Sequence, residues 1–301
     1  MNVIVFADVL LPVFLVGASG FALGRLTRIG SESLVKVVFY ILQPALIFQA
    51  LFTGVVVGDT ISTTILFVLL FHVTLVATGS LGQLALRWDE RKNLAMLLSL
   101  SFNNTGAYAL PILLFAFGKQ GLALGVVYLV AHSVLQATLA VGIASWRRGS
   151  SLLSSAKSIL TVPWIYAVIL AVILRSAGVT IPNALTRSLD LLSSAAIPMQ
   201  LVLLGLQFSE VRLASVFREA APIALVKLVA PPLIAVGLAA ILGIHGLILG
   251  VLLVQASAPT AINSLLLAIR YDCRPDLVAA IVLLTTVGSV LTIGLLLSFI
   301  T

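Results

Sequence analysis

Long apolar runs, separated by short polar loops, fill almost the whole chain. A helix that crosses a bilayer needs about 20 mainly apolar residues, whereas a transmembrane barrel alternates apolar and polar positions. Because the runs are continuous and rich in Leu, Val, Ile and Ala, they predict an all-α polytopic membrane protein. Ten transmembrane helices are expected, at residues 4–24, 34–53, 61–85, 94–117, 121–145, 158–177, 185–207, 216–242, 246–269 and 276–300.

Two of these spans are interrupted by polar and helix-breaking residues. The fourth contains Ser-Phe-Asn-Asn-Thr-Gly-Ala-Tyr-Ala-Leu-Pro at 101–111, and the ninth contains Gln-Ala-Ser-Ala-Pro-Thr-Ala-Ile-Asn at 255–263. Hydrocarbon offers no partner to a free N–H or C=O, so a membrane helix breaks only where protein or a water-filled cavity satisfies the backbone. In transporters, paired broken helices form the substrate site near the midplane. The two breaks therefore predict a binding site.

Landmarks of the first half recur in the second half at an offset of 154 residues. Gly24 then coincides with Gly178, and Pro44 with Pro198, while the first break falls on the second. This offset predicts two five-helix repeats, residues 1–150 and 151–301. Since five is odd, the second repeat enters the membrane from the opposite side, so the repeats are inverted and broken helices 4 and 9 are crossed.

Composition agrees with a membrane protein and sets its orientation. The chain is 61% hydrophobic and 9% charged, against about 25% charged residues in soluble domains. The net charge of +7 arises from basic residues at span ends, which argues against nucleic acid as a partner. Thirteen Lys and Arg residues lie in odd-numbered loops and three in even-numbered loops. This bias predicts cytoplasmic odd loops and both termini outside.

Each break is expected to start a new half-helix, at Gly106–Phe117 and at Pro259–Ile269. A helix N-terminus carries free N–H donors and about half a positive charge, so two such ends facing one cavity would attract an anion such as a carboxylate. Gln43 and Gln255 are further, second-tier contacts. The predicted substrate-binding residues at the breaks are Asn103, Asn104, Thr105, Gly106, Ser257, Pro259, Thr260 and Asn263.

Ionisable residues inside the spans leave the coupling ion open. The spans hold no Asp or Glu at mid-depth, which argues against a cation exchanger. Lys227 either balances the charge of the substrate or snorkels to the cytoplasmic surface. His72 either relays protons or is a neutral hydrogen-bonded histidine, and the same two interpretations apply to His132. The sequence predicts no metal site and no cofactor, and coupling to Na⁺ or H⁺ is not decided.

Three motifs resemble the auxin efflux carrier family over essentially the whole chain. They are Asn104-Thr-x5-Pro111, Gln255-x3-Pro259 and Tyr271-x3-Pro275-Asp276. The family includes plant PIN-type carriers and bacterial permeases associated with malate and malonate. The resemblance implies a fold similar to those of bile-acid symporters and Na⁺/H⁺ antiporters, with elevator movement of a transport domain against a scaffold, often in a homodimer. It also implies that Asn104 binds the substrate carboxylate.

The predicted function is secondary active transport of organic anions, auxin-like or dicarboxylate, across the cytoplasmic (inner) membrane by elevator-type alternating access. Plant members have a Pro- and Gln-rich motif where this chain has Thr260 and Ala261, which argues against auxin itself. A sodium-coupled bile-acid-type symporter is the alternative, and a channel is a further one. Three scattered histidines and one cysteine do not form a catalytic set, so no enzyme is predicted. The expected partners are a small organic anion, the lipid bilayer and a second copy of the chain.

Overall fold

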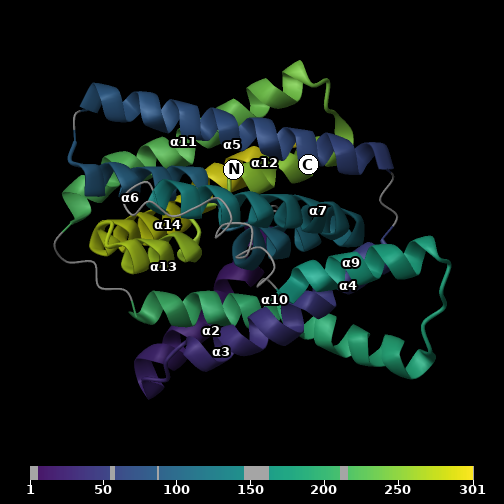
Figure 1. The fold of residues 1–301 in the computed structure, drawn as a ribbon. Coiled ribbons are helices and arrows are strands. Elements are labelled where there is room, and N and C mark those ends of the chain that lie inside the picture. The colour runs from purple at the N-terminus through teal and green to yellow at the C-terminus, as the bar shows by residue number, and fades with distance from the viewer. Residues whose placement is uncertain (1–5, 55–57, 87, 146–162, 211–215, 301) are drawn as a thin grey trace.

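The computed structural model describes residues 6–54, 58–86, 88–145, 163–210 and 216–300, and these form helices joined by short connections (Figure 1). The predicted all-α fold is confirmed. The π-helical segments are η1 (Phe6–Leu10), η2 (Val38–Leu42) and η3 (Thr105–Ala109). The α-helices are α2 (Leu11–Thr27), α3 (Glu32–Val37), α4 (Gln43–Thr53), α5 (Gly58–Leu86), α6 (Glu90–Ser101), α7 (Leu110–Ser145), α9 (Pro163–Ser176), α10 (Asn183–Glu210), α11 (Phe217–Ile241), α12 (Gly246–Ala256), α13 (Ile262–Tyr271) and α14 (Pro275–Ile300).

Seven helices in the described residues are long and apolar enough to cross a membrane, and three shorter apolar helices accompany them. The predicted count of ten stays a prediction. The breaks divide the fourth and ninth predicted spans into shorter pieces, and the described part of the sixth predicted span is the 14-residue helix Pro163–Ser176. A left-handed Gly118, with φ of 63°, also lies inside α7, where the fourth span was expected to turn into the fifth.

The helices form two groups (Figure 1). One group contains α2, α3, α4, α9 and α10, with α2 packed along α10 and α4 packed along α9. The other contains α5, α6, α7 and α11 to α14, in which α5 and α11 pack on each other and on the interrupted helices. The two groups face each other across η2, η3 and the start of α7. Both breaks belong to the second group.

Glycines bring α2 and α10 into backbone contact within the first group. A Cβ on Gly205 would lie 1.8 Å from the carbonyl oxygen of Gly17, and a Cβ on Gly20 would lie 2.0 Å from that of Val202. Small residues at such positions let membrane helices approach closely. These glycines therefore allow α2 and α10 to pack backbone to backbone, because any side chain there would force the helices apart.

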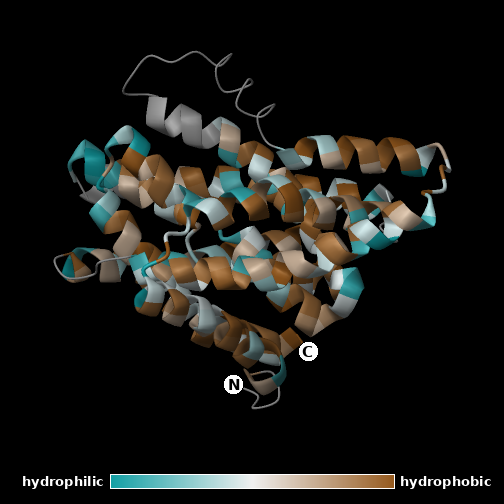
Figure 2. Cartoon of the chain, turned by 90° about the horizontal axis from the view of Figure 1, so that it is seen from below, coloured by the Kyte–Doolittle hydropathy of each residue, from teal (hydrophilic) through white to brown (hydrophobic). Residues whose placement is uncertain are grey.

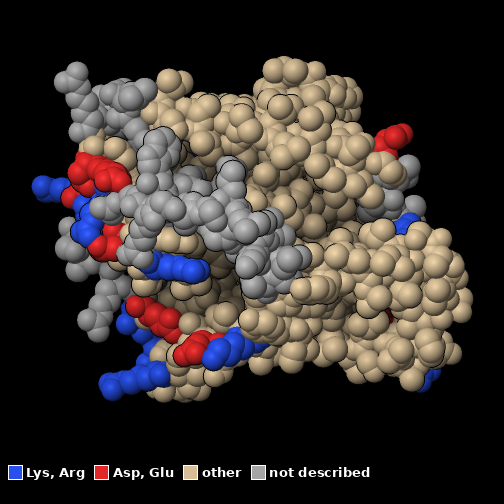
Figure 3. All heavy atoms as spheres, viewed as in Figure 1, with Lys and Arg blue, Asp and Glu red and all other residues tan. Residues whose placement is uncertain are grey.

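The outer surface has the chemistry of a membrane protein. Apolar residues cover the outward faces of the helices (Figure 2), including Leu15, Ile169 and Leu233, which are all more than one third exposed. Charged side chains gather mainly at the end of the molecule where α6 begins and α13 ends (Figure 3). At that end Lys92 pairs with Glu219 at 3.5 Å. This separation of apolar flanks from a charged end fits a bilayer around the flanks.

Some predictions concern residues that the structure does not describe. The predicted repeat boundary between residues 150 and 151 falls among them, as do the start of the sixth predicted span and the basic residues Arg147, Arg148, Lys157 and Arg212. The repeats and the loop-charge argument for orientation therefore remain predictions.

Candidate functional site

The two breaks meet and satisfy each other's backbone. Phe102 leaves α6 in an extended conformation, and Asn103 pairs with Thr260 in an isolated antiparallel β-bridge. The N–H of Asn104 donates to the Pro259 carbonyl at 2.7 Å, and the N–H of Ala261 donates to the Phe102 carbonyl at 3.0 Å. Polar backbone exposed by a break must find such partners inside a membrane. The breaks therefore form one structural unit although more than 150 residues separate them.

The carbonyl end of α6 is capped by side chains from the other elements. The last four carbonyls of any helix lack intrahelical partners. Three of those in α6 accept hydrogen bonds from buried donors: Thr260 Oγ1 donates to Ser99 O at 2.9 Å, Ser264 Oγ to Leu98 O at 3.0 Å and Lys227 Nζ to Leu100 O at 2.8 Å. This helix end is thus closed by protein.

The carbonyl end of α12 is capped by Asn103. The side-chain Nδ2 of Asn103 donates to the carbonyls of Gln255 at 2.9 Å and Ala256 at 2.7 Å, while its Oδ1 accepts from Lys227 Nζ. Asn103 is 1% exposed. Its whole amide is therefore occupied in joining α12 to α11 across the crossing point.

The N-terminal ends of the second half-helices are arranged differently, because they line a cavity. The cavity has a volume of about 130 Å³ and lies between the two helix groups. Its wall includes residues 104–107, where η3 begins, and residues 261–263, where α13 begins. The first N–H groups of a helix lack intrahelical partners and carry the positive end of its dipole. Two such ends facing one cavity favour a negatively charged guest.

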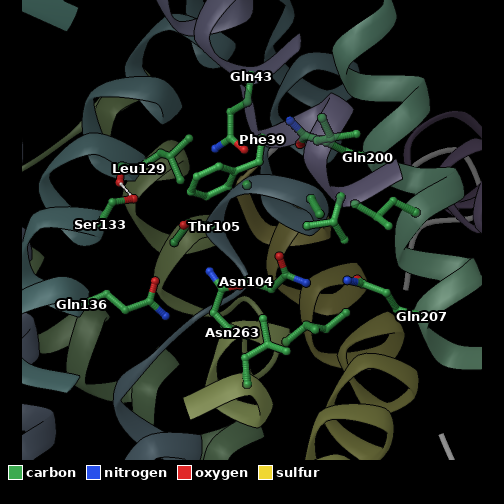
Figure 4. A pocket seen from close by; sticks show the side chains of 18 of the residues that line it. Phe39, Gln43, Asn104, Thr105, Leu129, Ser133, Gln136, Gln200, Gln207 and Asn263 are labelled. Atoms are coloured by element: carbon green, nitrogen blue, oxygen red, sulfur yellow. Dashed lines mark hydrogen bonds between the residues drawn. The ribbon is translucent and has the colours of Figure 1, made fainter. Parts of the chain in front are cut away.

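Uncommitted amide side chains surround this cavity and point toward a common space (Figure 4). None of them hydrogen-bonds to another described residue, and no Lys, Arg, Asp or Glu lines the cavity within the described chain. Among them, Gln200 is 2% exposed and both of its polar atoms lack a described partner. The amides are Gln43 on α4, Asn104 before η3, Gln136 on α7, Gln200 and Gln207 on α10, and Asn263 on α13.

The predicted substrate-binding residues separate into two sets. Asn103, Asn104, Thr105, Gly106, Asn263 and Gln43 line the cavity. Ser257, Pro259, Thr260 and Gln255 do not, because they lie buried in or before the crossing segment. Gln255, for example, donates to the Gly125 carbonyl at 3.1 Å. That the lining residues bind a substrate stays a prediction.

One local expectation changes. The half-helix that follows the second break starts at Ile262 rather than at Pro259, and Pro259 serves the crossing by offering its carbonyl to Asn104. Gly106, which lines the cavity, does not have a positive φ. A Cβ there would meet only Leu129 at 3.7 Å and Gln43 at 3.8 Å, which are ordinary contact distances. The local backbone and packing therefore do not require glycine at position 106.

Sequence reasoning missed several wall residues, including Gln136, Gln207, Phe39 and Trp164. Each lies outside the two breaks, so the break pattern carries no signal for it. For Gln200 a signal existed: it lies two residues after Pro198, as Gln43 lies directly before Pro44. An amide close to a proline in each half indicates the same wall.

The buried ionisable residues lie behind the cavity wall. Lys227 is 1% exposed and does not line the cavity, so it neither snorkels to the surface nor contacts a guest directly. His72 Nδ1 contacts the Val68 carbonyl at 2.7 Å, and His132 Nδ1 contacts His72 Nε2 at 2.8 Å. The two histidines thus form a buried hydrogen-bonded pair that joins α5 and α7. His72 is part of this pair and does not stand alone in its helix.

Comparison with known proteins supports transport as the task of this site. The family model described as membrane transport protein matches residues 5–297. An uncharacterised transporter of Methanothermobacter thermautotrophicus is 27% identical over 96% of both chains, and another from Methanocaldococcus jannaschii is 29% identical over 95% of both. These matches indicate a transporter and not an enzyme. The chain therefore belongs to the membrane transport protein family, the auxin efflux carrier family that its motifs resemble.

Proposed function

We propose that this protein is a secondary transporter that carries a small organic anion, with a carboxylate as the recognised group, across the cytoplasmic membrane. The observation that carries the proposal is that the two kinds of helix end at the crossing have different surroundings. The carbonyl ends of α6 and α12 accept protein donors, whereas the N-terminal ends at η3 and α13 face the cavity. An anion complements exposed N-terminal ends.

The cavity wall indicates how such an anion would be held. Amides supply N–H donors that can bind a carboxylate without a fixed positive charge, so the substrate could leave again on the other side. Asn104 and Asn263 are nearest in sequence to the two helix starts and would contact the carboxylate. The cavity of about 130 Å³ suits a molecule of few heavy atoms. Gln43 and Gln200 on the opposing group would contact its other polar end.

Packing between the helices supports two inverted repeats with ten spans. Exchanging each helix for its counterpart at the offset of 154 residues preserves the contacts. The pair α2–α10 becomes α9–α4, the pair α5–α7 becomes α11–α14, and the pair α5–α11 becomes itself; all of these pairs are in contact. Such a relation is expected of inverted repeats around a central site.

Elevator movement is the mechanism that this arrangement favours. The cavity lies between the group that holds both breaks and the group built on α2 and α10. Sliding the group that holds both breaks against the group built on α2 and α10 would carry the bound anion from one side to the other. The close glycine contacts between α2 and α10 suit the latter group to the role of a scaffold. The family resemblance favours a homodimer, and the loop charges favour both termini outside the cytoplasm.

A sodium site at the carbonyl ends is the less favoured hypothesis. Unwound carbonyls and helix C-terminal ends are where transporters of this kind bind Na⁺. In the described structure the carbonyls of Ser99, Gln255 and Ala256 already accept protein hydrogen bonds. Such carbonyls are poorer cation ligands, so this site favours the anion over a bile-acid-type sodium symport.

Uptake of radiolabelled malate, malonate and acetate into proteoliposomes tests the proposal. We expect saturable uptake of at least one carboxylate, and faster uptake when the vesicles are preloaded with the same carboxylate. Counter-exchange of this kind separates a carrier from a channel. Uptake that is equal with and without protein for all three acids would contradict the proposal, provided the protein is folded and inserted.

A further inference from the structure

Lys227 is the only Lys or Arg within the described structure that is fully buried, and no carboxylate pairs with it. It lies at mid-length of α11, which packs against α5, α6, α12 and α14. Ionisable residues inside membrane segments are costly and usually functional. A buried lysine without a paired carboxylate therefore suggests a functional role in which the side chain is protonated in only one state of the protein.

The ionisable groups around Lys227 are few. Glu219, on the same helix, lies eight residues away, which is about 12 Å along the axis. His72 on α5 and His132 on α7 are within electrostatic reach, and α12 has no ionisable residue. The remaining charged residues on the packed elements lie in their first turns: Asp59 on α5, Glu90, Arg91 and Lys92 on α6, Arg218 on α11 and Asp276 on α14.

The hydrogen bonds of Lys227 match a neutral amine better than an ammonium. Nζ donates to two acceptors, the Leu100 carbonyl and Asn103 Oδ1. An amine has two N–H groups, so both are used, whereas an ammonium has three and keeps one without a described partner. The charged form is thus the one that gains from an additional negative group nearby.

The cavity is the place where such a negative group would arrive. Asn103 accepts from Lys227 through Oδ1 and also lines the cavity, so the lysine lies one residue behind the wall. The cavity itself has no charged side chain among the described residues. A carboxylate bound there would find in protonated Lys227 the nearest buried positive charge that the described chain can provide.

We propose that Lys227 binds a proton when a carboxylate occupies the cavity and releases it when the carboxylate leaves, so that the protein moves an organic anion together with H⁺. This inference rests on the proposed anion transport. The balance is simple: the amine becomes an ammonium with a proton from water, and this proton offsets one carboxylate charge of the anion that crosses. Binding is reciprocal, so the proton strengthens anion binding by the same factor as the anion strengthens proton binding.

The histidine pair is less suited to this role. His72 Nδ1 must donate to the Val68 carbonyl, so its Nε2 accepts from His132 Nδ1. Each imidazole then carries one proton already. A second proton on His72 would place two donors against each other. His132 Nε2 is the other ring nitrogen without a proton; it has no hydrogen bond of good geometry, and the backbone of Asn103 lies within reach of the His132 ring. The pair is therefore assigned to joining α5 with α7.

Calorimetric titration of the purified full-length protein with malate tests the inference. Titrations at about pH 6.5 and about pH 8.5 keep both malate carboxyl groups ionised. Two buffers of different ionisation enthalpy at each pH report the protons taken up per malate. We expect tighter binding at the lower pH, by up to about tenfold per pH unit for one linked proton, and net proton uptake at the higher pH. Equal affinity at both pH values without proton uptake would overturn the inference while leaving anion transport intact.

Three variants assign the proton to a residue. Lys227→Arg keeps the charge but does not titrate, so it should bind malate with no pH dependence and no proton uptake. Lys227→Met, which has a similar shape and no charge, should bind malate weakly and also without pH dependence; it serves if the arginine does not fold. His132→Gln should keep the proton uptake of the original protein. Loss of proton uptake in His132→Gln together with its retention in Lys227→Met would overturn the assignment.

A broader outcome separates this inference from the function on which it depends. If malate, malonate, acetate and benzoate all fail to bind a folded protein at either pH, the proposed carboxylate transport is wrong, and the inference fails with it. If Lys227→Arg binds malate, and if proteoliposomes that contain this variant still use a pH difference to accumulate malate against its gradient, another group carries the proton.

Discussion

The two kinds of helix end at the crossing have opposite surroundings, although they lie a few residues apart. The carbonyl ends of α6 and α12 are closed by side chains of Asn103, Thr260, Ser264 and Lys227. The N-terminal ends at Thr105 and Ile262 open on the amide-lined cavity. The difference teaches that one polar interruption contains two kinds of polar group. Some of them form hydrogen bonds that hold the helices together, and others face the cavity.

The neighbouring asparagines give the strongest way to break this comparison. Asn103→Ala would leave two buried carbonyls without a partner and would remove one of the two acceptors of Lys227 Nζ. Each buried polar group left unpaired costs about 1–3 kcal/mol, so we expect a loss of about 3 kcal/mol or more in the free energy of unfolding. Thermal unfolding in detergent measures it. Asn104→Ala is the matched control and should unfold at the temperature of the original protein; equal stability of both variants would contradict the division of roles.

Asn104→Ala should instead impair transport. A hydrogen bond to a charged group contributes about 1.5–3 kcal/mol, so kcat/KM for carboxylate uptake should fall by about ten- to a hundredfold. Asn104→Asp places a negative charge at the same point of the cavity and should lower uptake further. Proteoliposome uptake at matched protein density gives both values. Unchanged uptake in the alanine variant would show that the open helix end at Thr105 does not hold the substrate.

Thr260 tests the capped carbonyl end of α6, and its replacement is expected to have a smaller effect on stability than that of Asn103. Thr260→Val keeps the shape and removes the hydroxyl that donates to the Ser99 carbonyl. We expect a loss of about 1–2 kcal/mol in stability, because that carbonyl is buried, with little change in the KM for uptake. Thr260→Ser retains the donor and should unfold close to the original temperature. A rise in KM without a loss of stability would place Thr260 at the substrate after all.

Gln200 tests the wall of the cavity. Its replacement has the smallest expected effect, and stability is expected to rise and not to fall. Its buried amide has no described partner, so Gln200→Leu removes an unpaired polar group and should raise stability by about 1 kcal/mol. The same change removes a contact for the far end of the substrate and should raise KM. Gln200→Glu, which keeps the shape but adds a negative charge, should repel the anion more strongly. Lower stability with unchanged uptake in the leucine variant would make Gln200 a packing residue.

Much of this arrangement is visible in the sequence, since membrane helices rarely contain such polar breaks. The pattern of apolar runs predicts the all-α membrane fold, and the breaks predict Asn104, Asn263 and Gln43 near a cavity. The opposite wall was not predictable in full, because Gln136 and Gln207 lie on regular helices where an amide more often joins helices than binds a ligand. Lys227 and His72 were visible as buried ionisable residues, yet their partners were not.

The sequence by itself determined the class of protein, the position of both breaks and the polar residue types placed there, because a helix can open in hydrocarbon only where protein or a cavity satisfies its backbone. Only the tertiary structure decided which polar groups are occupied. Asn103 and Asn104 are adjacent residues of the same type, so the sequence does not distinguish them. The partners of Asn103 lie more than 120 residues away, on α11 and α12. Hydrogen bonds between segments so distant depend on how the helices pack, and this packing closes one asparagine into the fold and leaves the other facing the cavity.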